Sequence, residues 1–170
     1  MLVAGVAALL VGIVPESHDQ TVEDTSVSII GIGQAIDGDS LIVNGREIRL
    51  WGLDAVELHQ SCDLHGKPWR CGQAAKQALA EIITATPLTC LVRNTDRYGR
   101  AVAECFLSSD RAGNTSLNGL LVEHGWAMAY RRYAEQYIPY ETCARDQQRG
   151  IWASRFVPPW DWRKGQRLAP

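Results

Sequence analysis

The chain has 170 residues, of which 46% are apolar and 21% are charged. This composition predicts one globular domain with a single core and excludes a largely disordered chain. The formal net charge of −2 is unevenly distributed, because residues 1–45 contain six acidic residues and no Lys or Arg, whereas the remainder has 17 basic and 13 acidic residues. The modest positive excess of the remainder permits polyanion binding without requiring it.

An apolar run of small and aliphatic residues occupies positions 2–14. It is too short to span a bilayer comfortably but has the length of a signal-peptide core. No basic residue precedes it and no clear small-x-small cleavage site follows it, so a retained membrane anchor is the alternative. We therefore expect residues 1–25 to be a signal-like or anchoring segment with a polar linker, residues 26–165 to form the domain, and the protein to be exported.

Three β-branched runs at positions 27–30, 40–43 and 47–50 predict three strands. The second and third runs are joined by Asn44-Gly45, a pair that tolerates the positive φ of a type I′ turn and therefore predicts a hairpin. Positions 71–85 change to helical spacing, with alanine, leucine and isoleucine on one face, and predict a helix that packs on the core.

Two further strands are predicted at positions 88–92 and 101–107, around a polar turn. Helices are predicted at 117–124, which precedes Gly125, and from Pro139 to about position 149. The tail after this helix has too many Pro and Trp residues for a regular element, and we expect it to pack across the barrel. The prediction is a mainly β fold of five strands with about three flanking helices (β+α).

Five cysteines in an exported chain indicate disulfides and leave one thiol over. Cys90 and Cys105 are equidistant from the middle of the turn between the last two strands, so they would face each other across the hairpin. Cys62 and Cys71 bracket a loop that contains Gly and Pro, which favours a second bridge. Cys143 lies in a predicted helix and is expected to be a small packing residue.

An alternative exists for the second pair, because His59, Cys62, His65 and Cys71 lie within thirteen positions and could hold Zn²⁺ tetrahedrally. Their intervals of three, three and six are irregular for a zinc finger. In an exported chain the disulfide is the preferred interpretation.

Acidic residues gather around the first hairpin. Asp37-Gly38-Asp39-Ser40 precedes its first strand and can direct two carboxylates at a hard cation, although Asp-Gly pairs are also common in turns. Arg49, Asp54 and Glu57 follow the hairpin at intervals of five and three and flank an apolar segment. Charged residues in this arrangement indicate a site.

Segments 35–57, 96–100 and 150–152 together resemble the signature segments of the staphylococcal thermonuclease family. The resemblance covers roughly residues 27–155, and the expected elements occur in the family's order. It implies a five-stranded OB-fold barrel that binds nucleic acid, and a Ca²⁺-dependent nuclease, an endonuclease in expectation, that hydrolyses DNA or RNA phosphodiesters. No obligate protein partner is evident in the sequence, and we expect a monomer.

The resemblance also implies a role for each charged residue. Asp39 and Asp54 match the family's Ca²⁺-binding carboxylates, and the main-chain carbonyl of Ala55 matches a third oxygen ligand. Glu57 matches the carboxylate that activates the attacking water. Ala55-Val56 stands where the family usually has Thr-Pro, so the loop that bears Glu57 is expected to be looser.

Two arginines and two tyrosines complete the implied site. Arg49 and Arg100 match the guanidinium groups that bind the phosphate and stabilise its transition state, a task that suits a planar, permanently charged fork. Tyr98 matches a family tyrosine, and Tyr130 matches one in the nucleotide pocket, where aromatic faces stack bases.

Two other functions stay open at this point. One is a nucleic-acid-binding barrel without catalysis, and the other is a phosphodiesterase that acts on lipid or cell-wall diesters with the same metal site.

Overall fold

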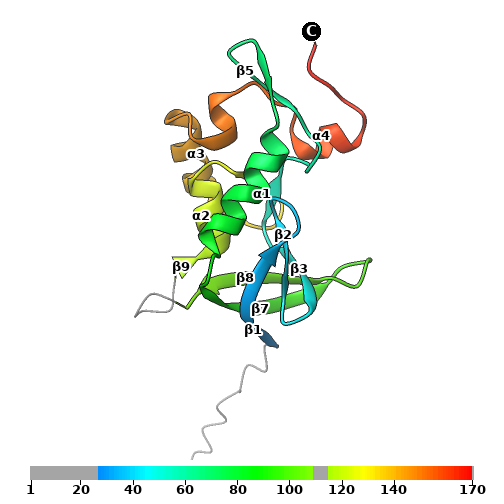
Figure 1. Cartoon of the computed structure of the whole chain (residues 1–170), viewed down its shortest axis with the longest axis vertical. Helices are drawn as coiled ribbons and strands as arrows, with labels where there is room; N and C mark the ends of the chain where they lie inside the picture. Colours follow the sequence, from blue (N-terminus) through cyan, green and yellow to red (C-terminus); the bar gives the residue numbers. More distant parts are fainter. Residues whose placement is uncertain (1–26, 109–114, 170) are drawn as a thin grey trace, which may run out of the picture.

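The computed structural model describes residues 27–108 and 115–169 of the protein (Figure 1). The predicted signal-like or anchoring segment at 1–25 lies outside the described residues. Within them, no helix is both long and apolar enough to cross a membrane.

Five strands form a closed barrel, as predicted: β1 (Ser28–Ala35), β2 (Ser40–Val43), β3 (Arg46–Leu50), β7 (Pro87–Thr95) and β8 (Ala101–Leu107). They pair in the order β3-β2-β1-β7-β8, and a parallel pairing of β3 with β8 closes the sheet. A two-residue strand, β9 (Thr115–Ser116), pairs antiparallel with the end of β8. The mainly β, OB-type architecture is confirmed.

Alternation along the strands fills the barrel with aliphatic side chains. Leu41, Ile48 and Leu88 are fully buried, and a Cβ on Gly33 of β1 would lie only 2.8 Å from Leu88 Cδ1. The β2–β3 hairpin turns at Asn44-Gly45, whose φ angles of 49° and 72° are those that the dipeptide predicts.

Two pairs of short strands lie outside the barrel and were not predicted from the pattern. β4 (Leu53–Ala55) pairs with β10 (Ala127–Ala129), and β5 (Cys62–Leu64) pairs with β6 (Lys67–Trp69). These strands have three residues each. Such lengths are too short to show an alternating pattern.

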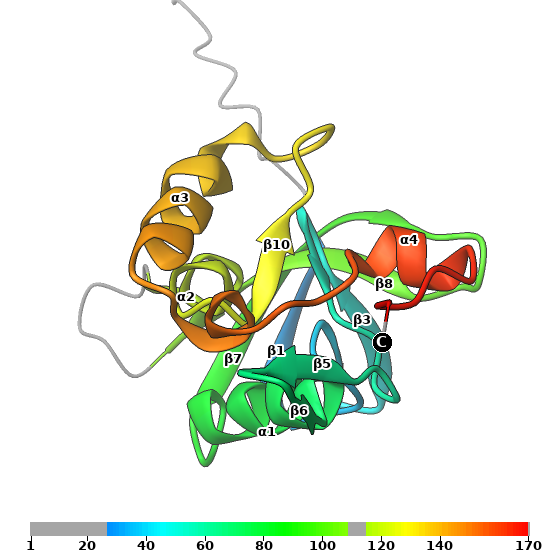
Figure 2. The ribbon, with the colours of Figure 1, turned by 90° about the horizontal axis from the view of Figure 1, so that it is seen from above.

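The described residues form four α-helices and two 3₁₀ turns. The helices are α1 (Cys71–Ile82), α2 (Leu117–Glu123), α3 (Ile138–Asp146) and α4 (Pro159–Arg163). The 3₁₀ turns are η1 (Glu135–Tyr137) and η2 (Gly150–Ala153). Figure 2 shows α1, the α2–α3 pair and α4 on different sides of the central strands. Helix α1 ends earlier than predicted, and Ala85, with a φ of 53°, lies in the left-handed region before Pro87.

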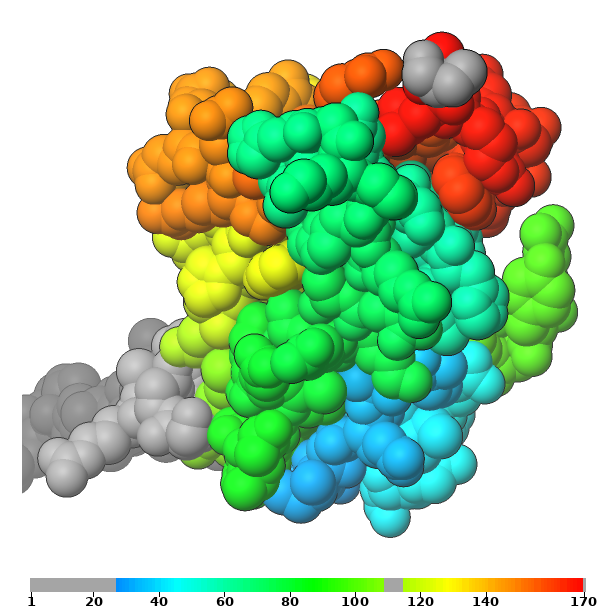
Figure 3. Space-filling model, turned by 45° about the horizontal axis from the view of Figure 1, so that its top comes forward, coloured from blue at the N-terminus to red at the C-terminus, as the bar shows by residue number. Residues whose placement is uncertain are grey.

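The prediction that the tail lacks a regular element was wrong, because α4 forms there. Pro159 occupies the first turn of α4, a position at which proline is tolerated because its missing N–H has no helical partner. Trp160 packs against a second apolar cluster that contains Val56, Met128 and Ile151. Instead of crossing the barrel, the tail therefore lies at the same end as the β5–β6 hairpin (Figure 3).

Both predicted disulfides are present, Cys62–Cys71 and Cys90–Cys105. Cys90 and Cys105 are direct partners in the β7–β8 register, as the hairpin symmetry predicted. Because Cys62 and Cys71 are bonded to each other, they are not available as thiolate ligands, and the zinc alternative is wrong. Cys143 is a free, partly buried thiol in α3.

Candidate active site

Asp39 lies just before β2, and its carboxylate is almost completely buried, with 3% of the residue exposed. It accepts hydrogen bonds from the main-chain N–H of Ala55 at 2.7 Å and from the hydroxyl of Ser40 at 3.2 Å. The guanidinium of Arg49 makes a short ion pair with the same carboxylate. The loop before β2, the end of β3 and the end of β4 therefore meet at one buried carboxylate.

Arg49 joins the two predicted metal-binding aspartates. Beyond its contact with Asp39, its Nη2 donates to Asp54 Oδ1 at 2.7 Å. Burial raises the pKa of Asp39 to about 7, and the attraction of Arg49 offsets only part of that effect. Burial alone would lower the pKa of Arg49, but Asp39 and Asp54 together raise it, so Arg49 stays protonated.

Asp54 and Glu57 are held by an arginine that the sequence did not indicate. Arg163 of α4 binds both oxygens of Asp54, with Nη2 at 2.6 Å from Oδ2 and Nη1 at 3.1 Å from Oδ1. The same Nη1 lies 2.7 Å from Glu57 Oε1. Asp54 is buried, whereas 38% of the Glu57 side chain is exposed. Glu57, which the family resemblance predicts as the base, is thus the carboxylate at the open side of the cluster.

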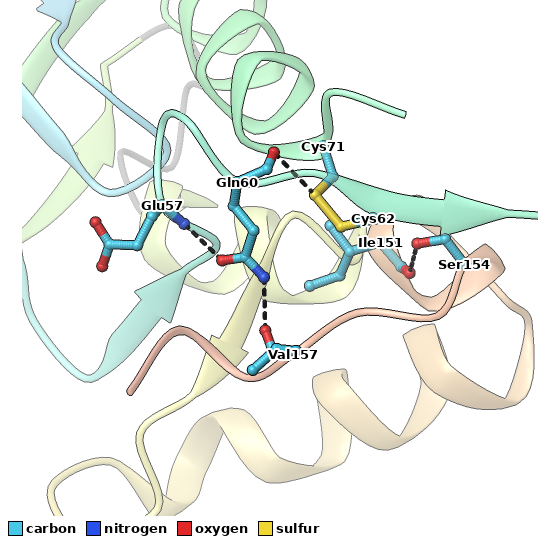
Figure 4. The surroundings of a disulfide bond; sticks show 7 residues. All are labelled: Glu57, Gln60, Cys62, Cys71, Ile151, Ser154 and Val157. Atoms are coloured by element: carbon cyan, nitrogen blue, oxygen red, sulfur yellow. Dashed lines mark hydrogen bonds between the residues drawn. A yellow bond between two sulfur atoms is a disulfide. The ribbon is translucent and has the colours of Figure 1, made fainter. Parts of the chain in front are cut away.

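The main chain at Glu57 is fixed by Gln60 (Figure 4). The Gln60 side chain accepts from the N–H of Glu57 at 3.1 Å and donates to the carbonyl of Val157 at 2.6 Å. The residue is buried, with 1% exposed, and lies beside the Cys62–Cys71 disulfide. It therefore connects the loop that bears Glu57 to the C-terminal segment.

Arg100 belongs to the β7–β8 turn and reaches the site indirectly. It donates to Asp96 Oδ2 at 2.8 Å and lies 3.5 Å from the Ser40 hydroxyl, which in turn bonds Asp39. Tyr98 is 69% exposed at the same turn, where the guanidinium of Arg97 lies over its ring. The structure thus places Arg100 beside the carboxylate cluster and Tyr98 at the turn, outside the cluster.

A cavity of about 480 Å³ opens beside the cluster, between the β7–β8 turn and α4. Its walls include Arg49, Asp54, Asp96, Tyr130 and Arg163. The rings of Tyr130 and Tyr133, another lining residue, stack with centroids 5.1 Å apart. An aromatic wall beside two guanidiniums suits a nucleotide, whose base can stack while its phosphate is bound.

The family described as "Staphylococcal nuclease homologue" matches this chain over residues 47–154. That span is more than half of the chain and includes Arg49, Asp54, Glu57 and Arg100. The chain belongs to the staphylococcal nuclease family.

Curated relatives of this nuclease-family chain agree with the match. A micrococcal nuclease of Shigella flexneri is 31% identical over 147 residues, which cover 79% of each chain. The succinoglycan biosynthesis protein ExoI of Rhizobium meliloti is 34% identical, over 75% of this chain and 66% of that protein. A probable staphylococcal-like nuclease, CAN4, of Oryza sativa is 27% identical, over 89% of this chain but only 29% of the relative. The chain thus spans under two thirds of the last two proteins.

The donor set of this nuclease-family site fits a hard divalent cation. Asp39 and Asp54 are buried carboxylates from separate segments, and two guanidiniums offset their negative charge in this structure. Among the residues that the structure describes, no group of three or more His, Cys, Asp or Glu side chains has the geometry of a metal centre. The predicted set differs from such a group because its third ligand is a main-chain carbonyl, that of Ala55.

Sequence reasoning missed Arg163 and Gln60. Arg163 lies outside the span that matches the family and 109 positions from Asp54. Its local signal was the Pro-Pro pair ahead of a short basic segment, which indicates a helix start but no partner. Gln60 had no signal, since a buried glutamine is identified by its contacts alone.

Proposed function

We propose that this member of the family is a Ca²⁺-dependent nuclease that hydrolyses the phosphodiester bonds of DNA and RNA. Membership of the family and its nuclease relatives support nucleic-acid hydrolysis. The observation that supports the finer proposal is the continuous network through Asp39, Arg49, Asp54 and Glu57, in which four residues of the predicted set share one cluster.

In this proposal Asp39, Asp54 and the carbonyl of Ala55 hold the cation. When bound, Ca²⁺ supplies Lewis-acid polarisation of a phosphate oxygen and partly offsets its charge. The two carboxylates come from segments that Arg49 already holds together, so the ligands are arranged before the ion arrives. Their burial keeps competing water away from the charge.

Glu57 acts as the general base, and Arg49 and Arg100 stabilise the phosphate. Glu57 is the exposed carboxylate of the cluster, so it can accept a proton from a water molecule that attacks the phosphorus. A phosphodiester repels hydroxide, and negative charge accumulates on its equatorial oxygens as the transition state forms. Two arginine forks that donate to these oxygens lower that barrier.

Substrate binding in this proposal is directed at the backbone. Tyr130 lines the cavity and would stack a base, whereas Tyr98, at the exposed turn, would contact a neighbouring nucleotide. Stacking and phosphate contacts read neither base identity nor the sugar strongly, so both DNA and RNA are expected substrates.

The direct test compares wild type with Glu57→Gln on a plasmid and on a labelled RNA, in Ca²⁺, in Mg²⁺ and in chelator. We expect wild type to cleave only in Ca²⁺, or faster in Ca²⁺ than in Mg²⁺. The cleavage rate of Glu57→Gln should be lower than that of wild type by about 10²-fold or more. Glu81→Gln is the matched control, because Glu81 is an exposed residue of α1 whose side chain bonds Gln77.

The same samples separate the two other functions. Fluorescence anisotropy of a labelled oligonucleotide would detect binding without cleavage by the wild type, which would make the chain a non-catalytic binding module. Preferential hydrolysis of small or lipid diesters in competition with oligonucleotides would reassign the substrate.

We also propose that the protein is exported and acts as a monomer. Two disulfides support export, because such bonds persist in oxidising compartments. Cell fractionation tests the location, and sedimentation tests the mass.

A further inference from the structure

The oxygens of both buried aspartates already have partners in this structure. Asp39 binds Arg49 through one oxygen and the N–H of Ala55 through the other. Asp54 binds Arg49 and Arg163 through Oδ1, and Arg163 again through Oδ2. A cation that is to bind Asp54 must therefore replace a guanidinium.

Arg163 is the guanidinium that can leave. Arg49 projects from a barrel strand and has 24% of its side chain exposed, whereas Arg163 projects from a helix of five residues and has 46% exposed. Releasing Arg163 returns a half-exposed cation to water, and releasing Arg49 would leave Asp39 without its ion pair. Desolvation makes the second change the costlier one.

Arg163 stays beside the site even when it leaves Asp54, because the segment before α4 is fixed at two places. The carbonyl of Val157 accepts from Gln60 at 2.6 Å. Arg155 forms a two-way main-chain bridge with Asp63, at 2.8 Å in each direction. Arg163 also lines the cavity that contains Arg49 and Tyr130.

We propose that Arg163 is a third guanidinium of the active site, which binds Asp54 and Glu57 in the cation-free protein and turns to a phosphate oxygen of the nucleic acid when a divalent cation takes Asp54. This rests on the proposed nuclease function. Arginine suits both partners, since its fork fits a carboxylate and a phosphate equally well.

The test uses the whole chain and measures Ca²⁺ binding by isothermal titration calorimetry in the absence of nucleic acid. Wild type is compared with Arg163→Gln, with Arg163→Lys and with Lys164→Gln as the control. Lys164 follows Arg163 in sequence, is 70% exposed and bonds only Asp161 among the ion pairs of the described residues. Thermal unfolding in chelator verifies that each variant is folded.

Arg163→Gln is expected to bind Ca²⁺ about tenfold more tightly than wild type, because the competing charged hydrogen bonds are lost. Arg163→Lys keeps the charge without the planar guanidinium, so its Ca²⁺ affinity is expected to lie between those of wild type and Arg163→Gln. The Ca²⁺ affinity of Lys164→Gln should match that of wild type. On an oligothymidylate, Arg163→Gln is expected to raise KM about tenfold and to change kcat less than KM.

Equal or weaker Ca²⁺ binding by Arg163→Gln would overturn the proposal, and so would an unchanged KM. If wild type nevertheless cleaves in Ca²⁺, the proposed function stands and only the role of Arg163 fails. If wild type and variant neither bind Ca²⁺ nor cleave, both proposals fail. Should Arg163→Gln not fold, the Ca²⁺ affinity and the KM of Arg163→Lys are compared with those of wild type and decide in the same way.

Discussion

Gly72, in the first turn of α1, lies directly against the loop that bears Glu57. A Cβ on Gly72 would be 1.9 Å from the carbonyl oxygen of Glu57 and 2.7 Å from that of Leu58, whereas real Cβ contacts are essentially never under 3.0 Å. In Gly72→Ala the Glu57 carbonyl must therefore move by about 1 Å, and a misplacement of that size can reduce a reaction rate about 10²-fold. We expect kcat to fall by about that factor, with about 1–3 kcal/mol lost in stability from overpacking.

The assay is kcat on a labelled oligonucleotide at saturating Ca²⁺, with urea unfolding measured on the same samples. Gly119→Ala is the matched control, because a Cβ on Gly119 of α2 would meet Ser116 Cβ at an ordinary 3.5 Å. It should keep kcat and gain up to about 1 kcal/mol from helix propensity. If folded Gly72→Ala retains kcat within about twofold of wild type, the position of the Glu57 backbone does not govern the reaction and the reasoning is refuted.

Three further outcomes are expected. Gln60→Ala removes the hydrogen-bond partner of the buried Val157 carbonyl and of the partly buried Glu57 N–H, so the free energy of unfolding in urea should fall by about 2–4 kcal/mol. A loss under about 1 kcal/mol would contradict the linking role. Replacing Cys90 and Cys105 by serine removes a bridge with a separation of 15 residues and should cost about 3 kcal/mol, with cleavage retained at temperatures where the variant is folded; loss of cleavage in the folded variant would count against this. Burial raises the pKa of Asp39 to about 7, so the native carboxyl keeps a proton that the unfolded chain releases near pH 4. In chelator, the unfolding free energy of wild type should therefore fall as pH rises from about 4 to 7, by up to about 1.4 kcal/mol per unit, relative to Asp39→Asn; parallel profiles would show that Asp39 is ionised throughout.

Local pattern was sufficient for the parts of the site that lie near one hairpin. The turn at Asn44-Gly45 fixes the register in which Ser40 pairs with Arg49, and this pairing brings Asp39 to the guanidinium. The same symmetry argument at the second hairpin placed Cys90 opposite Cys105. In each case the turn determines which residues face one another.

Contacts that depend on the path of the tail were beyond such reasoning. Arg163 reaches Asp54 from a segment that is held by the Gln60–Val157 hydrogen bond and by the Arg155–Asp63 bridge, so the interaction depends on contacts between segments far apart in sequence. Tyr98 shows the converse limit. Its motif gave its position in the turn correctly, but only the structure shows that its ring is exposed at that turn and lies outside the carboxylate cluster.

The pair Ala55-Val56 indicated a looser loop than the usual Thr-Pro of the family, and the structure gives a physical reason to expect the opposite. Val56 is 1% exposed and packs in the apolar cluster that includes Cys62, Cys71 and Ile151. The N–H of Ala55 donates to Asp39 at 2.7 Å, which fixes the residue before Val56. Proline restricts a loop by limiting φ, whereas here a buried side chain and a charged hydrogen bond restrict it on both sides of the same peptide. The position of Glu57 is therefore determined by tertiary contacts, and it should be sensitive to substitutions in that cluster that a proline-containing loop would tolerate.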